Sequence, residues 1–140
     1  LMKEVHILLV EDNEGDIILT KEALKEAKIK NAITVARDGQ EALDILNTAH
    51  HLPDLILLDI NLPKVNGLEV LSSVKNDDRL KSIPVIMLST SCSERDITTS
   101  YNNYANCFIT KPVDLLKFID LVNSIEDFWI SIVKLPKQAL

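Results

Sequence analysis

Residues 55–59 read Leu-Ile-Leu-Leu-Asp, an uninterrupted apolar run that ends in a carboxylate. Two similar runs stand on either side of it along the chain, Ile-Leu-Leu-Val at residues 7–10 and Val-Ile-Met-Leu at residues 85–88. Each run has the length of a strand, and strands that are apolar throughout are typically buried on both faces of a sheet. Such a sheet needs helices above and below it, connected to the strands by right-handed crossovers. The three runs therefore predict an α/β protein with a mainly parallel sheet.

Two further strand-length runs, at residues 33–36 and 107–109, bring the number of predicted strands to five. The segments between the runs have the apolar spacing of helices, and several follow a residue that suits a helix N-cap, such as Asp38 and Ser93. The predicted helices are 16–27, 38–47, 68–75, 94–104 and a last one from about 114. Strands and helices thus alternate, as in repeated βα units.

The last predicted helix is longer than the others, because its apolar pattern continues to Val133. Twenty residues of helix span about 30 Å, more than a small five-stranded domain needs. The aromatic pair Phe128-Trp129 either packs back on the same core or forms a face for self-association or another partner, and the sequence leaves both open. We expect a single domain with a C-terminal helical extension over residues 3–135, followed by a tail at 136–140.

Length and charge exclude several classes of protein. The chain has 140 residues, with 15 Lys and Arg against 21 Asp and Glu, so its formal charge is −6. This length suits one self-sufficient domain, the charge disfavours binding to nucleic-acid phosphates, and the apolar runs are far shorter than the roughly 20 residues of a membrane span. Cys92 and Cys107 match neither a CxxC pair nor a zinc pattern, and no secretory signal is visible, so we expect a protein of the reducing cytoplasm.

Polar side chains follow four of the five apolar runs at the point where each run ends. Glu11 and Asp12 follow the first run, Asp59 the third, Ser89 the fourth and Lys111 the fifth. The carboxyl ends of parallel strands meet at one edge of the sheet, which is where such proteins bind ligands. We therefore expect three carboxylates, a hydroxyl and an ammonium group to gather at this edge.

This set of groups favours metal-assisted phosphoryl chemistry. Two unit charges 4 Å apart repel by about 4 kcal/mol at an effective dielectric constant of 20, so three neighbouring carboxylates need a cation. A site with few carboxylates that keeps water ligands suits Mg²⁺ better than Ca²⁺. The metal and Lys111 would together neutralise a phosphoryl group, and an aspartate is a competent nucleophile toward it. A single Asp after a strand is more often a turn residue, so the prediction depends on the whole set.

At these residues the chain resembles the receiver domains of two-component response regulators. Glu11-Asp12 is similar to the acidic metal-binding pair of that family, and Asp59 is similar to its phosphoacceptor within the pattern D-x-x-x-P-x-x-x-G, which ends at Gly67. The resemblance implies that Glu11, Asp12, Asp59 and the backbone carbonyl of Asn61 hold Mg²⁺, with Mn²⁺ as an alternative ion. Glu11 replaces the commoner Asp and lengthens one arm of the site by a methylene group.

The resemblance also implies a role for three residues near the last two strands. Ser89 stands where the family has its switch Thr or Ser, and Lys111-Pro112 resembles a Lys-Pro pair whose peptide bond is typically cis. Phe108 corresponds to the aromatic residue that turns inward when the hydroxyl moves toward the phosphoryl group. The likeness extends from Lys3 to about Ile125 and implies a flavodoxin-like, doubly wound parallel sheet of five strands in the order 2-1-3-4-5, with five helices.

Within the family, the segment Glu-Asp-Asn-Glu-Gly-Asp at residues 11–16 and the Phe128-Trp129 tail are similar to stand-alone regulators that partner bacterial phytochrome-type histidine kinases. This resemblance implies a signalling protein, not an enzyme, that takes a phosphoryl group from a kinase phosphohistidine onto Asp59 in a phosphorelay and promotes only its own phosphorylation and dephosphorylation. A homodimer through the extended last helix is one of the two arrangements that its apolar pattern leaves open. Because 15 residues follow Ile125, too few for a DNA-binding module, we expect no direct nucleic-acid or membrane partner.

Three other functions share parts of this sequence pattern. A haloacid-dehalogenase-type aspartyl phosphatase usually has a second Asp two residues after its nucleophile, where this chain has Asn61. A flavodoxin-like electron carrier needs a phosphate-binding loop after the first strand, and the acidic residues 11–14 have the wrong charge for it. A degenerate receiver that acts only as an interaction scaffold would not need the complete set of site residues, which this chain has. The phosphatase and the scaffold remain the alternatives.

Overall fold

The computed structural model describes residues 4–25, 31–89, 97–99, 102 and 105, and the backbone of residues 107–110. Over these residues the elements are β1 (Val5–Val10), α1 (Glu14–Lys25), β2 (Asn31–Ala36), α2 (Gly39–Thr48), β3 (Leu55–Asp59), α3 (Gly67–Lys75), β4 (Val85–Ser89) and β5 (Cys107–Thr110). The expected last helix lies outside the described residues, as does Lys111. Of the predicted fourth helix, residues 97–99 and 102 are described, and they are helical.

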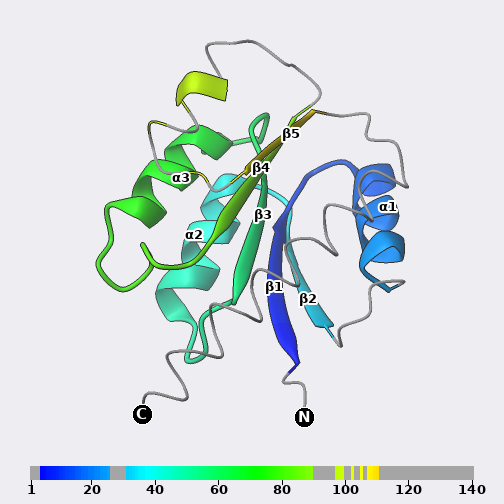
Figure 1. The fold of residues 1–140 in the computed structure, drawn as a ribbon, viewed down its shortest axis with the longest axis horizontal. Helices are drawn as coiled ribbons and strands as arrows, with labels where there is room; N and C mark the ends of the chain where they lie inside the picture. The colour runs from blue at the N-terminus through cyan, green and yellow to red at the C-terminus, as the bar shows by residue number, and fades with distance from the viewer. Residues whose placement is uncertain are drawn as a thin grey trace.

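The five strands form one sheet in the order β2-β1-β3-β4-β5, and every neighbouring pair is parallel. The parallel α/β architecture predicted from the apolar runs is therefore confirmed (Figure 1). The register pairs Val10 of β1 with Leu58 of β3, and Asp59 at the end of β3 with Leu88 of β4. As a result, the carboxyl ends of β1, β3 and β4 lie next to one another at one edge of the sheet.

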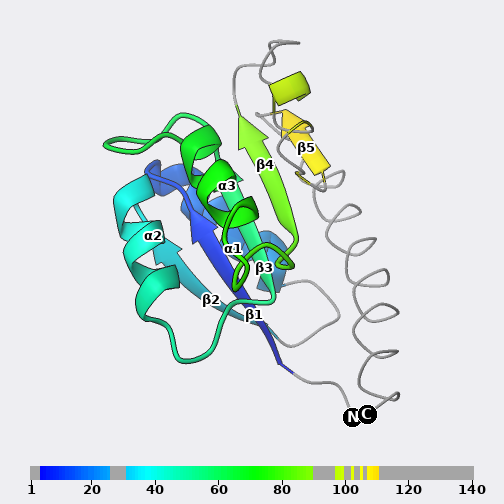
Figure 2. The ribbon, with the colours of Figure 1, turned by 90° about the vertical axis from the view of Figure 1, so that its left-hand side faces the viewer.

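Helices cover both faces of the sheet, as its doubly apolar strands require. Figures 1 and 2 show α2 and α3 on one face and α1 on the other. Alternate residues of β1 point to opposite faces, so Leu8 packs in the cluster beneath α2 and α3 while Leu9 packs beneath α1. All five residues of β3 and all five of β4 are buried.

The helix starts follow the capping residues. Asp38 is the N-cap of α2 and its side chain accepts a hydrogen bond from the backbone N–H of Glu41 at 2.7 Å, as its position before the helix predicted. Asn66 is the N-cap of α3, and its side chain accepts a hydrogen bond from the backbone N–H of Glu69. The prediction for α1 was wrong at its start, because the helix begins at Glu14 rather than at residue 16.

No helix among the residues that the structure describes is long and apolar enough to cross a lipid bilayer. The described helices instead have one apolar face toward the sheet. α1, for example, buries Ile17, Ala23 and Leu24 against the strands. The helices therefore serve to cover the sheet and to carry the loops at its carboxyl edge.

Candidate functional site

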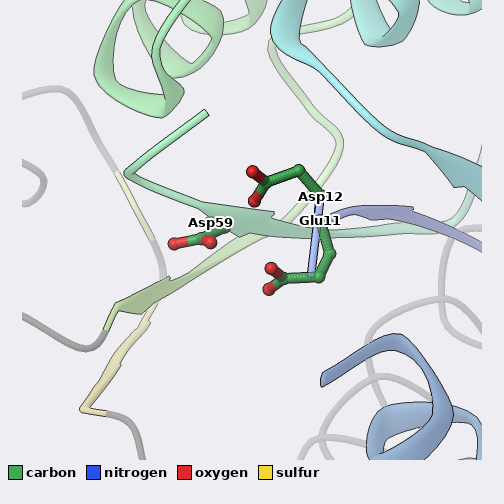
Figure 3. Close-up of side chains that lie close together, drawn as sticks. All are labelled: Glu11, Asp12 and Asp59. Atoms are coloured by element: carbon green, nitrogen blue, oxygen red, sulfur yellow. The ribbon is translucent and has the colours of Figure 1, made fainter. Parts of the chain in front are cut away.

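Three carboxylates from two neighbouring strand ends converge at the carboxyl edge of the sheet. Glu11 and Asp12 directly follow β1, and Asp59 is the last residue of β3. One carboxylate oxygen of each residue lies within 4.8 Å of the other two (Figure 3). The predicted gathering of these three acids is thus present, and it follows from the parallel pairing of β1 with β3.

The three acids differ in their exposure to solvent. Glu11 is 1% exposed and Asp59 is 7% exposed, whereas Asp12 faces solvent. The buried carboxylates accept hydrogen bonds from backbone N–H groups of the following loops: Asn13 donates to Oε1 of Glu11 at 3.1 Å, and Asn61 donates to Oδ1 of Asp59 at 3.3 Å. The acidic cluster is therefore closed by protein on the side of Glu11 and Asp59 and open to solvent on the side of Asp12.

This donor set fits a hard divalent cation. Carboxylate oxygens are the ligands that Mg²⁺ and Mn²⁺ prefer, and Mg²⁺ usually keeps several waters, which the exposed side of the cluster allows. Without a cation, each pair of charges 4.8 Å apart repels by about 3.5 kcal/mol at an effective dielectric constant of 20. The separation of the oxygens thus supports a cation-binding role for Glu11, Asp12 and Asp59.

The loop of residues 60–66, between β3 and α3, is folded tightly against the end of β3. Ile60 N–H donates to the carbonyl of Leu88 at 3.0 Å, and the carbonyl of Ile60 accepts from Gly67 N–H at 2.8 Å. A Cβ atom at Gly67 would lie 2.0 Å from the carbonyl oxygen of Asp59, so no larger residue fits without moving the backbone. This close approach explains the glycine that ends the D-x-x-x-P-x-x-x-G pattern.

Ser89 ends β4 directly beside the β3 strand end, and it is 0% exposed. Asn61 follows Asp59 by two residues, so its backbone lies in the first turn of the 60–66 loop. Phe108 belongs to β5, where the backbone alone is described, and Lys111 lies outside the described residues. The structure therefore brings together the acids and places Ser89 on the adjacent strand, and the assignments of Phe108 and Lys111 stay predictions.

Two ion pairs near the site were missed at the level of the sequence. Nη1 of Arg37 lies 2.5 Å from Oε2 of Glu14, and Nζ of Lys64 lies 3.5 Å from Oδ2 of Asp38. The hydrogen bond and the charge of Glu14 raise the pKa of the already basic Arg37, while the hydrogen bond from Glu41 N–H, helped by Lys64, lowers the pKa of Asp38. Each pair joins segments that are distant in sequence, so no local sequence pattern predicts it.

A doubly wound parallel sheet with an acidic cluster at its carboxyl edge, centred on the aspartate that ends the third strand, defines a receiver-like α/β protein. Residues 7–123 match the family model of the response regulator receiver domain. The chain therefore belongs to the receiver-domain family of response regulators, which are signalling proteins, as the motifs at its strand ends implied. This membership decides against the haloacid-dehalogenase-type phosphatase and the electron carrier.

The similar proteins include response regulators of phytochromes. The chain is 42% identical over 135 residues to the response regulator Rcp1 of Synechocystis sp., covering 93% of this chain and 92% of that protein. Among solved structures, the phosphorylated cyanobacterial phytochrome response regulator RcpA is 45% identical with a TM-score of 0.82, covering 93% and 96% of the two chains. The Mn²⁺-bound form of Rcp1 has a TM-score of 0.79 at 42% identity, covering 89% and 94%. The predicted likeness to phytochrome-associated regulators is thus confirmed.

Proposed function

We propose that Asp59 accepts a phosphoryl group from a phosphohistidine of a phytochrome-type sensor histidine kinase. The observation that carries this proposal is the position of Asp59, which ends β3 with a carboxylate oxygen within 4.8 Å of oxygens from Glu11 and Asp12. Family membership and the likeness to the phosphorylated regulator RcpA support it.

Glu11, Asp12, Asp59 and the backbone carbonyl of Asn61 would hold Mg²⁺, or Mn²⁺ as in the structure of the relative Rcp1. When bound, the ion offsets the negative charge of the carboxylates and of the phosphoryl oxygens. Asp12 faces solvent, so the ion is reached from the open side of the cluster. The buried Glu11 keeps its orientation through the hydrogen bond from Asn13 N–H.

The chain's own nucleophile is a carboxylate oxygen of Asp59. The new O–P bond forms as the N–P bond of the donor phosphohistidine breaks, and the imidazole of the kinase leaves with that electron pair. The hydrogen bond from Asn61 N–H to Oδ1 holds the carboxylate in one orientation. Lys111 and Ser89 then bind the phosphoryl oxygens, and movement of Ser89 toward them gives Phe108 room to turn inward. This step shifts the surface formed by the fourth helix, β5 and the last helix between two states.

Intact-mass measurement tests the assignment of Asp59. The protein is incubated with MgCl₂ and acetyl phosphate, and the mass of one added phosphoryl group is expected in the parent and in the control Asp44→Asn, which changes an exposed acid on α2. Asp59→Asn should show no such addition. Labelling that survives in Asp59→Asn would overturn the assignment.

The remaining parts of the proposal concern partners and location. As a signalling protein, the chain promotes only its own phosphorylation and dephosphorylation. The lack of a disulfide or zinc pattern for Cys92 and Cys107 supports a place in the reducing cytoplasm, where the kinase partner is expected to act. The apolar continuation of the sequence to Val133 supports a domain over residues 3–135 and a homodimer formed through the last helix.

Sedimentation tests the homodimer. The parent chain is compared with a truncation after Ile125, which removes the aromatic pair Phe128-Trp129. We expect a dimer for the parent and a monomer for the truncated chain. Monomers in both samples would instead support packing of the aromatic pair on the core of its own chain.

A further inference from the structure

The N-terminus of α2 contacts the 60–66 loop, although the two segments are far apart in sequence. Gly39 N–H donates to the carbonyl of Pro63 at 3.4 Å. A Cβ atom at Gly39 would lie 1.8 Å from the carbonyl oxygen of Val65 and 2.8 Å from its Cβ. The φ angle of Gly39 is not positive, so the backbone conformation alone would admit any residue. Glycine is needed here because the loop approaches the helix too closely for a side chain.

The residue before Gly39 holds the same loop in a second way. Oδ1 of Asp38 accepts the capping hydrogen bond from Glu41 N–H, and Oδ2 of the same carboxylate lies 3.5 Å from Nζ of Lys64. Lys64 has a φ of 67°, the left-handed conformation that costs a side-chain-bearing residue about 1 kcal/mol or more. Asp38 therefore links the start of α2 to the most strained residue of the loop.

The loop is thereby fixed at two points, and the residues of the site lie at one end of it. Gly67, directly after the loop, lies against the carbonyl of Asp59, and Gly39 lies against the loop at Pro63 and Val65. Asn61, whose N–H donates to Oδ1 of Asp59, precedes both points in the loop. Any displacement of the loop at Val65 is passed along few residues to Asn61, because the loop is short and its ends are held.

We propose that Gly39, assisted by Asp38, is a positioning residue of the phosphoacceptor site: the N-terminus of α2 holds the 60–66 loop where Asn61 and Asp59 bind a divalent cation. This inference rests on the proposed role of Asp59 and Asn61 in the cation site. Gly39 touches no proposed ligand and acts only through the loop backbone. Partners that hold metal ligands in place typically change metal affinity by about 10-fold to 100-fold when they are altered.

Calorimetric titration with MgCl₂ tests the proposal on Gly39→Ala. Alanine adds no charge, so a change in affinity reports geometry rather than Coulomb attraction. We expect the dissociation constant to rise by roughly tenfold. The matched control is Val74→Ala, a core truncation near the C-terminal end of α3, which should lower stability and leave the Mg²⁺ affinity unchanged. A folded Gly39→Ala that binds Mg²⁺ within about twofold of the parent would overturn the proposal.

A second variant covers the case in which Gly39→Ala does not fold. Lys64→Met removes one positive charge from the protein, so Coulomb attraction alone predicts tighter or equal Mg²⁺ binding. Loss of the contact with Asp38 predicts weaker binding instead. Weaker binding supports the proposal and tighter or equal binding contradicts it. Lys64 is exposed, so this substitution leaves the core unchanged.

The rate of labelling by acetyl phosphate separates positioning from a general loss of activity. In Gly39→Ala the MgCl₂ concentration for half-maximal labelling should rise in step with the dissociation constant, while the rate at saturating MgCl₂ is largely retained. A fall in the saturating rate with an unchanged half-maximal concentration would contradict the proposal. A parent protein that neither binds Mg²⁺ nor takes the label would refute the proposed function itself, whereas a normal parent with a normal Gly39→Ala would refute only this inference.

Discussion

The exposed member of the acidic cluster offers a direct test of the charge repulsion at the site. Replacing Asp12 by Asn removes one of three negative charges whose oxygens lie within 4.8 Å of one another, and it keeps the size of the side chain. Without a metal, the variant should be more stable than the parent. With Mg²⁺, it should lack most of the stabilisation that the parent gains, because one ligand has been lost.

The size of the effect follows from the separation of the oxygens. At 4.8 Å, one pair of unit charges repels by about 0.9 kcal/mol in water and by about 3.5 kcal/mol at an effective dielectric constant of 20. Asp12 faces solvent, so its two interactions, with Glu11 and Asp59, lie toward the lower value. We therefore expect a gain of about 1 to 2 kcal/mol at low salt, which raises the Tm of a chain this long by roughly 3 to 7 °C.

The assay is thermal unfolding followed by circular dichroism, with EDTA and with MgCl₂. Glu22→Gln is the matched control, because it removes one charge from an exposed position on α1 and so changes the net charge equally. Added NaCl should raise the Tm of the metal-free parent more than that of Asp12→Asn, since salt screens the repulsion. An Asp12→Asn variant whose metal-free Tm is no higher than that of Glu22→Gln would refute the reasoning, and an undiminished Mg²⁺ response would remove Asp12 from the cation site.

Substitutions at three further positions test the loop and the helix caps that surround the site. Gly67→Ala should lower the free energy of unfolding by roughly 1 to 3 kcal/mol in urea titrations, because its Cβ would lie 2.0 Å from the Asp59 carbonyl; an unchanged midpoint would contradict this. Asn66→Ala should cost about 1 kcal/mol through the lost cap on Glu69 N–H, and Asn66→Asp should restore it. Asp38 has a pKa below its ordinary 3.8 in the folded protein, so its stabilising effect is present above that value and is lost as the pH falls through the lowered pKa. The stability difference between the parent and Asp38→Asn should accordingly shrink in acid, and a constant difference would exclude this carboxylate from the acid response.

Local sequence patterns were sufficient to predict the sheet and the acids of the site. The runs at 7–10, 55–58 and 85–88 are apolar throughout because each strand is covered on both faces, and this requirement is visible in the residues themselves. Parallel pairing then places the residue after each run at one edge, so the sequence alone groups Glu11, Asp12 and Asp59.

Contacts between loops could not be predicted in this way, because they depend on the exact path of the backbone in three dimensions. Nothing near Gly39 in the sequence shows that the carbonyl of Val65 approaches to a distance that excludes a side chain. Likewise, the pairing of Asp38 with Lys64 joins residues whose separation in sequence matches no helix or strand period. The sequence by itself thus determined which segments form strands and which acids follow them, since burial on both faces of the sheet acts through local composition. Only the tertiary structure decided how the 60–66 loop is held beside Asp59, since that depends on close packing between backbone segments.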